Sequence, residues 1–424
     1  MKVLVVGSTG FIGSHLVAAL AAAGHQVRCA SRKGLGASGC DARVTMDYTR
    51  PLKPDELRAA VAGCQVVINA VGILREHGEQ TFRSLHAEGP HALFTACAAA
   101  GVPRVIQISA LGAAADAPAH YHRSKHAADR HLMNGPTDWA IVQPSLVYGA
   151  GGSSAKLFDL LASMPVTFLP AGGTQRVQPV LIDDLVAAVL RLAETSATLR
   201  RVVPVVGPSP MTLREFLAHL RAALGFEPAR AIAIPAAIIS LAARIGDRLP
   251  GSLLDTETLG MLDRGNVADP DELRRLLGRD PAPVSAFVKP AEQAPRRAAA
   301  ALAWTLPLLR FGVAAMWLFA AIVSMGLYPV PESLALLRNI GAPPGAAPVL
   351  LIGAIALNLA FGVLSLVPRR PRWLWSAQIA LVVTYTVIIT WKLPALWLEP
   401  FGPVAKNIPI LALLLMLRQL DRRK

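Results

Sequence analysis

The sequence predicts an α/β domain with a doubly wound parallel sheet and a small helical lobe, followed by an all-α domain of four transmembrane helices. Short apolar runs alternate with helical patterns over roughly the first 200 of its 424 residues, which is typical of a parallel sheet covered on both faces. Beyond residue 301, apolar segments of about 20 residues succeed one another, as bilayer crossings require. The predicted parts are residues 1–285, a linker at 286–304 and a membrane domain at 305–420.

The first predicted strand, VLVV, runs directly into GSTGFIG and then into the amphipathic run HLVAALAAAG. Glycines at this spacing would form a tight turn, a path for a pyrophosphate along backbone N–H groups, and close packing of helix on strand. The helix N-terminus would add its partial positive charge. The turn therefore predicts a dinucleotide site. Its predicted contacts are Gly7, Ser8, Thr9, Gly10, Phe11, Ile12 and Gly13.

A secretory signal peptide is the alternative for this N-terminus. Lys2, an apolar stretch and a small-residue end have the outline of such a peptide. The polar GSTG break interrupts the apolar stretch, however, and the alternation of strands and helices continues after it. We therefore expect the N-terminus to be part of the mature domain.

Four further strands are predicted from the runs QVRCAS, QVVINAVG, RVIQISA and DWAIVQPS, and a helix from residues 79–100. Residues 211–279 have a more helical pattern and are expected to form the lobe that closes over the cofactor. Proline, alanine and basic residues then dominate residues 280–297, which places the linker there.

No metal site is predicted. The four cysteines form no CxxC pair and no His-spaced cluster, so we expect four reduced thiols. The histidines of segment 120–131 lack an HExxH pattern or a carboxylate partner, so a solvated helix face is the better interpretation. These residues are Cys29, Cys40, Cys64 and Cys97, and His120, His122, His126 and His131.

Three residues predict hydride chemistry. Ser109 ends the strand RVIQIS, and YHRSK opens the next helix, so Tyr121 and Lys125 lie one helical turn apart on one face. A tyrosine can pass a proton to a carbonyl oxygen, a nearby ammonium stabilises the phenolate, and a serine hydroxyl can hold the substrate oxygen. Ser109, Tyr121 and Lys125 are therefore the candidate catalytic residues.

The segments GSTGFIG, NAVG, QISALGA, YHRSK, QPSLVYG and VLIDDL together resemble the short-chain dehydrogenase/reductase superfamily of NAD(P)-binding Rossmann domains, over residues 1–285. They are most similar to its atypical branch, which includes the nucleotide-binding accessory subunit of respiratory complex I. The resemblance implies that Tyr121 is the general acid/base, that Lys125 also binds the nicotinamide ribose, and that Ser109 orients the substrate. It also implies cofactor contacts from Asn69, Ala70, Val71, Gly72, Pro144 and Ser145.

Ser109 precedes Tyr121 by twelve residues, whereas the extended, sugar-modifying members of the superfamily usually place this serine farther upstream. This departure weakens the interpretation as a nucleotide-sugar epimerase or dehydratase. Some atypical relatives bind the cofactor without turnover, so a scaffold or redox sensor is a second hypothesis.

The second strand indicates which dinucleotide is bound. No carboxylate follows it to bind a ribose 2′-hydroxyl, and Ser31, Arg32 and Lys33 could instead bind a 2′-phosphate. NADP is therefore favoured, with NAD as the alternative. Asp47 resembles the acidic residue of the family that contacts adenine, although an Asp before a turn is often structural. Asp183 and Asp184 begin an amphipathic helix, where capping is a better interpretation than acid/base catalysis.

The segments 311–328, 348–367 and 373–391 are the three predicted spans, and 400–417 is a weaker fourth. This part of the chain carries eleven basic and three acidic residues, a net charge of +8 out of +14. The arginines lie before the first span, between the second and third, and after the last, which places both termini and the nucleotide domain on the cytoplasmic side of the inner membrane. Four compact spans resemble the DoxX-like family. Polar residues inside or beside the spans are Asn358, Lys406 and Asn407.

These observations favour a membrane-anchored, NADPH-linked oxidoreductase for an apolar carbonyl, isoprenoid or quinone. The expected partners are the lipid bilayer, an apolar small molecule and, under the scaffold hypothesis, subunits of a membrane complex. The first domain has no interleaving of aromatic and basic residues of the kind that stacks bases, so no nucleic-acid partner is expected. The sequence indicates neither the substrate nor the oligomeric state.

Overall fold

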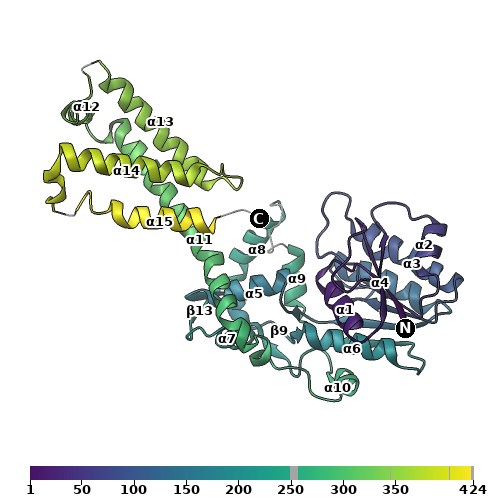
Figure 1. Cartoon of the computed structure of the whole chain (residues 1–424). Helices are drawn as coiled ribbons and strands as arrows, with labels where there is room; N and C mark the ends of the chain where they lie inside the picture. The colour runs from purple at the N-terminus through teal and green to yellow at the C-terminus, as the bar shows by residue number, and fades with distance from the viewer. Residues whose placement is uncertain (249–255, 344, 401, 422–424) are drawn as a thin grey trace. The chain divides into compact units, whose positions relative to one another are not determined.

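A computed structural model describes residues 1–248, 256–343, 345–400 and 402–421 (Figure 1). It divides into two compact units, Met1–Ala300 and Ala301–Lys424. Each unit has an apolar core of its own.

The first unit is built on a seven-stranded sheet with the order β11-β6-β5-β4-β1-β2-β3, in which every neighbouring pair is parallel. The predicted α/β class is confirmed. The strand order reverses beside β1, so the carboxyl ends of β1 and β4 border the crevice in which doubly wound sheets bind ligands. The strands are β1 (Lys2–Val6), β2 (Gln26–Ser31), β3 (Ala42–Thr45), β4 (Val66–Asn69), β5 (Arg104–Ile108), β6 (Asp138–Pro144) and β11 (Arg201–Val205).

Helices cover both faces of this sheet, which explains the uninterrupted apolar run of β1. Val3 and Val5 join one apolar cluster with α1, α6 and α10, and Leu4 and Val6 join the other with α2, α3 and α4 (Figure 1). All four side chains are fully buried, and each such burial stabilises the fold by about 1.5–3 kcal/mol. The helices are α1 (Phe11–Ala22), α6 (Ile182–Glu194), α10 (Asp271–Leu277), α2 (Pro54–Val61), α3 (Gly89–Ala99) and α4 (His120–Met133).

A smaller lobe has its own core around Phe216, Leu217 and Leu220 of α7. A capping box starts α7, because the Thr212 hydroxyl and the Glu215 carboxylate satisfy each other's backbone N–H groups. The lobe recruits segments before residue 211 as well as the predicted helical stretch. Its elements are α5 (Ser153–Ser163), α7 (Leu213–Ala223), α8 (Ala236–Gly246), α9 (Thr256–Asp263), β7 (Val147–Tyr148), β8 (Val166–Pro170), β9 (Arg176–Val177), β10 (Val180–Leu181), β12 (Met211–Thr212) and β13 (Arg230–Ile234).

The expectation of four reduced cysteines is wrong for two of them. Cys29 of β2 and Cys40 form a disulfide, with Cα atoms 5.8 Å apart. The chain turns back after β2 to lay β3 alongside it, with Cys29 paired to Arg43, so the end of the intervening loop returns beside Cys29. Their spacing of eleven residues matches no motif, so the pair could not be predicted from the sequence. Cys64 and Cys97 are buried thiols.

The second unit is helical, and three helices are long and apolar enough to cross a membrane: Pro290–Leu327, Ala347–Leu366 and Leu374–Lys392. The weaker fourth prediction corresponds to α15 (Asn407–Leu420), a shorter apolar helix. Segment 286–304, the predicted linker, is helical from Pro290 onward because it continues into α11 (Pro290–Ile322). A short helix, α12 (Val330–Asn339), was not predicted. The other two are α13 (Ala347–Leu366) and α14 (Leu374–Lys392).

Polar side chains tie these helices together. Asp421 accepts hydrogen bonds from Arg310, Arg370 and the indole of Trp375. Deeper in the unit, the Trp317 indole donates to Gln378, whose amide donates to a serine of α13. Among the polar residues singled out from the sequence, Asn407 donates to Thr386 at 2.8 Å. Asn358 is buried, and its carbonyl oxygen has no hydrogen-bond donor among the described residues.

Candidate functional site

The glycine turn leaves room for a ligand at the carboxyl end of β1. Gly7 has φ +83°, and a Cβ there would lie 3.0 Å from the backbone of Ala70 and Val71 after β4. The Gly10 N–H donates to the Gly7 carbonyl at 2.9 Å, and a Cβ on Gly13 would overlap that carbonyl. Gly7 and Gly13 are thus required for the close packing of the turn against α1 and the segment after β4, as in the glycine turn that brings a helix N-terminus to a pyrophosphate. These residues fit a dinucleotide.

Several predicted cofactor residues use their side chains to shape this edge of the sheet. The Ser8 hydroxyl turns inward and donates to the Ala30 carbonyl at 3.1 Å. The buried Asn69 amide donates to Gln107 of β5 at 2.7 Å. The Ser145 hydroxyl donates to the Gln178 carbonyl at 2.5 Å. At these positions only backbone groups are left to face a ligand.

The end of β2 presents two cations. Arg32 and Lys33 are exposed, whereas the buried Ser31 donates its hydroxyl to the Leu35 carbonyl at 2.5 Å and so holds their loop. Asp47 accepts hydrogen bonds from the backbone N–H and the hydroxyl of Thr49. One of its carboxylate oxygens therefore has a structural role in a turn.

Lys125 joins the ends of two strands. Its ammonium is 3% exposed and donates to the carbonyls of Val71 and Ile108, both at 3.1 Å. A Cβ on Gly72 would lie 2.9 Å from this nitrogen, so the glycine makes room for it. Burial lowers the pKa of Lys125 to about 8. Two of the three ammonium protons are used by these carbonyls, and one remains for a ligand.

Tyr121 stands one turn before Lys125 in α4, half-buried among aromatic rings. Its ring centroid lies 6.1 Å from Phe82, 5.5 Å from His86 and 5.3 Å from His122, each with edge-on geometry. Burial and the charge of Asp129 raise the pKa of Tyr121 to about 12. The phenol is therefore protonated at neutral pH. Its backbone N–H donates to the Glu257 carboxylate of α9 at 2.9 Å.

Asp129 is a member of this cluster that the sequence did not single out. Ser109 donates its hydroxyl to Asp129 at 2.5 Å, and the carboxyl is 3% exposed. Tyr121, Lys125 and Asp129 follow one another at intervals of four residues, so they share one face of α4. Burial raises the pKa of Asp129 to about 6. While Asp129 is ionised, it accepts the hydrogen bond that the Ser109 hydroxyl donates. Ser109 can then accept a hydrogen bond from a substrate but cannot donate one to it.

His86 is the second residue that the sequence did not single out. It lies in a π-helical turn, Arg83–Glu88, an irregularity frequent at functional sites. Its Nε2 accepts from the Ile73 N–H at 3.0 Å, so the ring proton lies on Nδ1, 2.8 Å from the Ser124 hydroxyl. Burial and the Lys125 charge lower the pKa of His86 to about 2. The ring is therefore neutral where it meets Tyr121.

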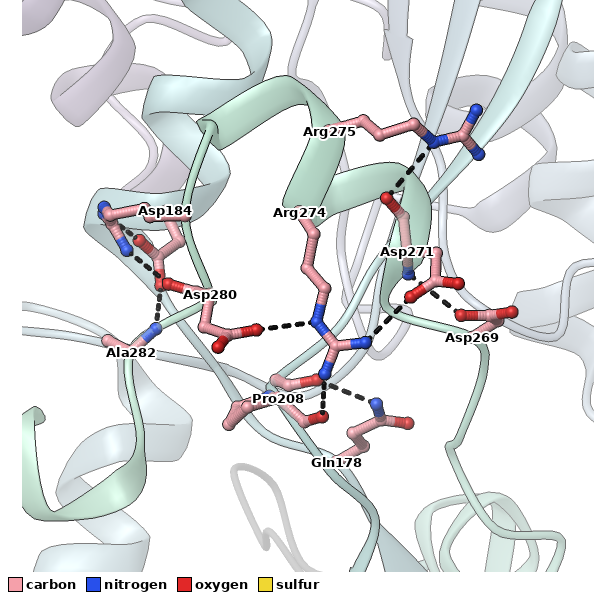
Figure 2. Close-up of polar contacts among 11 residues, drawn as sticks. Gln178, Asp184, Pro208, Asp269, Asp271, Arg274, Arg275, Asp280 and Ala282 are labelled. Carbon is pink, nitrogen blue, oxygen red and sulfur yellow. Dashed lines mark hydrogen bonds and ion pairs between the residues drawn. The ribbon is translucent and has the colours of Figure 1, made fainter.

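The acidic pair at the start of α6 has a structural role, and the prediction of helix capping is wrong. No side chain caps α6. Asp184 is fully buried and accepts from the Ala282 N–H at 2.7 Å (Figure 2). It also accepts from Arg279 at 2.5 Å, while Asp183 pairs with Lys289 at 3.1 Å. These contacts fasten the segment after α10 to the sheet domain.

Arg274 of α10 adds to this fastening. It pairs with Asp271 at 2.8 Å and with Asp280 at 2.7 Å, and it also donates to the Pro208 carbonyl (Figure 2). Among the residues that the structure describes, no three His, Cys, Asp or Glu side chains gather into a group that could hold a metal ion.

Residues 7–157 match the NAD(P)H-binding family, and residues 314–415 match the DoxX-like family. The chain therefore combines an NAD(P)H-binding Rossmann domain with a C-terminal DoxX-like domain. Both matches are to parts of the chain, and together they agree with the two units of the structure.

Curated relatives include reductases and a respiratory subunit. The mitochondrial NADH dehydrogenase [ubiquinone] 1 alpha subcomplex subunit 9 of Arabidopsis thaliana is 30% identical over 50% of this chain and 55% of its own length. The ceramide reductase of Caulobacter vibrioides is 31% identical over 46% of this chain and 61% of its own length. The match thus spans little more than half of these two relatives. The NAD(P)H azoreductase of Xenophilus azovorans is 26% identical over 66% of this chain and 91% of its own length.

Solved structures share the fold of the first unit. A nucleoside-diphosphate-sugar epimerase of Staphylococcus aureus superposes with a TM-score of 0.56 at 18% identity, over 68% of this chain and 99% of its own. The NADPH-dependent quinone oxidoreductase of Escherichia coli, solved with NADPH, gives 0.53 at 19% identity, over 68% of this chain and 98% of its own. At such identities the likeness shows the fold alone.

Gly7→Ala is expected to weaken NADPH binding about tenfold or more, because its Cβ would press on the backbone after β4 in addition to straining a positive φ. Gly24→Ala is the matched control, since Gly24 has φ +78° and an open surrounding, so it carries only the conformational cost of about 1 kcal/mol. Calorimetric titration of the detergent-purified chain measures both. Equal affinities for the two variants would contradict the account of the turn.

The raised pKa of Asp129 predicts a pH dependence of stability. Between about pH 4 and pH 6 the folded chain binds more protons at Asp129 than the unfolded chain does, so its contribution to stability falls as the pH rises. Asp129→Asn cannot titrate but can still accept from Ser109. The unfolding free energy of wild type should therefore fall relative to that of the variant by about 1–3 kcal/mol as the pH rises over this interval.

Thermal unfolding in detergent from pH 4 to pH 7 measures this shift. Asp55→Asn on the exposed face of α2 serves as the control and should run parallel to wild type. Parallel curves for wild type and Asp129→Asn would show that the carboxyl titrates alike in both states.

Proposed function

We propose that the chain is a membrane-anchored, NADPH-dependent reductase of the short-chain dehydrogenase/reductase type, acting on an apolar carbonyl, isoprenoid or quinone. One observation carries the proposal: Ser109, Tyr121 and Lys125 gather at the carboxyl edge of the sheet beside the glycine turn. Lys125 contacts the chain segments after β4 and at the end of β5, and it stands one turn from Tyr121. A NAD(P)H-binding domain supplies the setting in which such residues carry out hydride chemistry.

When bound, the reduced nicotinamide supplies a hydride to the substrate carbon. Tyr121 donates its phenolic proton to the substrate oxygen, which becomes a hydroxyl. The Lys125 ammonium stabilises the phenolate left behind, and its third proton is available for the nicotinamide ribose. When Asp129 is protonated it can donate to Ser109, and the Ser109 hydroxyl is then free to donate to the substrate oxygen.

NADPH is proposed over NADH because of the charge at the end of β2. Arg32 and Lys33 are exposed cations just where the adenosine ribose lies in this fold, and no carboxylate competes with a 2′-phosphate there. The Cys29–Cys40 disulfide closes the loop that carries them. The remaining contacts proposed for the cofactor are the turn at residues 7–13, the backbone at 69–72, Asp47, Pro144 and Ser145.

The membrane domain supports an apolar substrate. Three helices long enough to span a bilayer keep the chain beside molecules dissolved in lipid, which raises their local concentration. Relatives named ceramide reductase and azoreductase make reduction the favoured class of reaction. The proposed location is the inner membrane, with both termini in the cytoplasm.

A nucleotide-bound scaffold or redox sensor of a membrane complex is the second candidate. The similarity to a complex I subunit favours it, as does the hydrogen bond that commits the Ser109 proton to Asp129. A scaffold would retain nucleotide, co-purify with partner subunits and turn over no carbonyl or quinone. A nucleotide-sugar epimerase is supported only by shared fold.

Tyr121→Phe is expected to lower NADPH oxidation with an apolar carbonyl or quinone by about 10²–10⁴-fold, because it removes the acid that protonates the substrate oxygen. Nucleotide affinity should stay within about twofold, since the ring is retained. Tyr328→Phe in the second unit is the control. Unchanged turnover in Tyr121→Phe would overturn the proposed mechanism.

Substituting both Arg32 and Lys33 by Ala is expected to raise KM for NADPH about 10²–10⁴-fold, because each of the two charge-assisted contacts to phosphate contributes about 1.5–3 kcal/mol. KM for NADH should hardly change, since NADH lacks the 2′-phosphate. The control for net charge is the double variant Lys53→Ala with Arg58→Ala. It removes two exposed charges, one just before α2 and one within it. An equal rise for both nucleotides would count against the choice of NADPH.

A further inference from the structure

Helix α8 of the first unit exposes an unusually apolar surface. Ile238, Leu241 and Ile245 are 58%, 60% and 53% exposed. At about 100° per residue they fall within an arc of about 60° on one side of the helix. The residues on another side, Ile239, Ala243 and Gly246, are the ones that pack against the lobe. The composition of α8 would suit a core helix, yet half of its apolar surface faces outward.

The strand pair that precedes α8 in the chain also exposes large apolar side chains. β13 pairs in parallel with β8, and Ile232 lies opposite Phe168 in the register. These two side chains are 49% and 45% exposed. We call Phe168, Ile232, Ile238, Leu241 and Ile245 the α8 patch. A soluble surface rarely gathers this many large apolar side chains without a partner.

The charges around the α8 patch indicate what kind of partner covers it. Arg244 lies in the last turn of α8, Arg248 follows the helix and donates to the Arg244 carbonyl at 3.1 Å, and Arg230 starts β13. Segment 228–248 holds these three arginines and one acidic residue, Asp247. An apolar face bordered by arginines is typical of helices that lie in the plane of a lipid interface. The chain also carries three helices able to span a bilayer, so that interface is always within reach.

The α8 patch is linked to the candidate site through α9. Asp247, just after α8, accepts from the backbone N–H of Thr256 at 3.0 Å and from its hydroxyl. The next residue, Glu257, accepts from the Tyr121 N–H at 2.9 Å. The same short helix thus contacts both the exposed helix and the first turn of α4.

We propose that α8 and the β8–β13 pair insert their apolar side chains into the headgroup region of the bilayer, with the flanking arginines on lipid phosphates. This holds α8, which α9 connects to the first turn of α4, at the lipid surface. The inference concerns binding and does not depend on the proposed reductase activity, so either can fail without the other.

A spin label at Leu241→Cys tests this inference. The full chain is labelled and placed in nanodiscs of phosphatidylcholine and phosphatidylglycerol, and collisions with oxygen and with a water-soluble nickel chelate are measured by power saturation. Native cysteines give little background, because Cys64 and Cys97 are buried and the other two are paired. Arg58→Cys on the exposed face of α2 provides the matched helix-surface control.

The expected result is a Leu241→Cys label that collides often with oxygen and several-fold less with the nickel chelate than the Arg58→Cys label does. A label as open to the chelate as the control would overturn the inference. So would a label shielded from both reagents, because that would mean that protein covers the α8 patch.

Discussion

The buried ammonium of Lys125 is the constraint on which the site depends. It bridges the carbonyls of Val71 and Ile108 and so fixes the distance between the segment after β4 and the end of β5 at the crevice of the sheet. A buried charge without compensation is costly, and here it is compensated by two carbonyl dipoles and by the nearby carboxyl of Asp129. Gly72 has no side chain because the ammonium occupies that space. The position of Tyr121, one turn away on the same helix, follows from this anchor.

The titratable groups around the Lys125 ammonium have widely different pKa values. His86 is held neutral, Asp129 titrates at about 6, Lys125 at about 8 and Tyr121 at about 12. Burial is the main cause of each shift. Groups whose environments push their pKa values apart are suited to acid and base roles at neutral pH, and Ser109 is coupled to this series through Asp129. Burial of these side chains therefore sets the spread of pKa values on which the proposed mechanism depends.

The sequence predicted the parts of this arrangement that have a period or a motif. The glycines of the first turn, the alternating strands and the Tyr121 and Lys125 pair all left such a pattern. His86 and Asp129 did not, because each is a single polar residue within a helical stretch, and only the packing of α4 against its neighbours reveals their roles. The Cys29–Cys40 pair depends on the return of a loop, and the exposure of α8 depends on which of its sides the lobe covers. An apolar run alone cannot distinguish a core helix from one that faces lipid.

In the proposed function, this site transfers hydride to a molecule held in the bilayer. The most direct measurement supplies NADPH deuterated at C4 to the full chain in nanodiscs loaded with apolar aldehydes and ketones, and follows the products by mass spectrometry. We expect deuterium on the carbinol carbon, and about 10²–10⁴-fold less of it in the same time with Tyr121→Phe. Tight retention of nucleotide with no deuterium in any product would contradict it and would favour a scaffold.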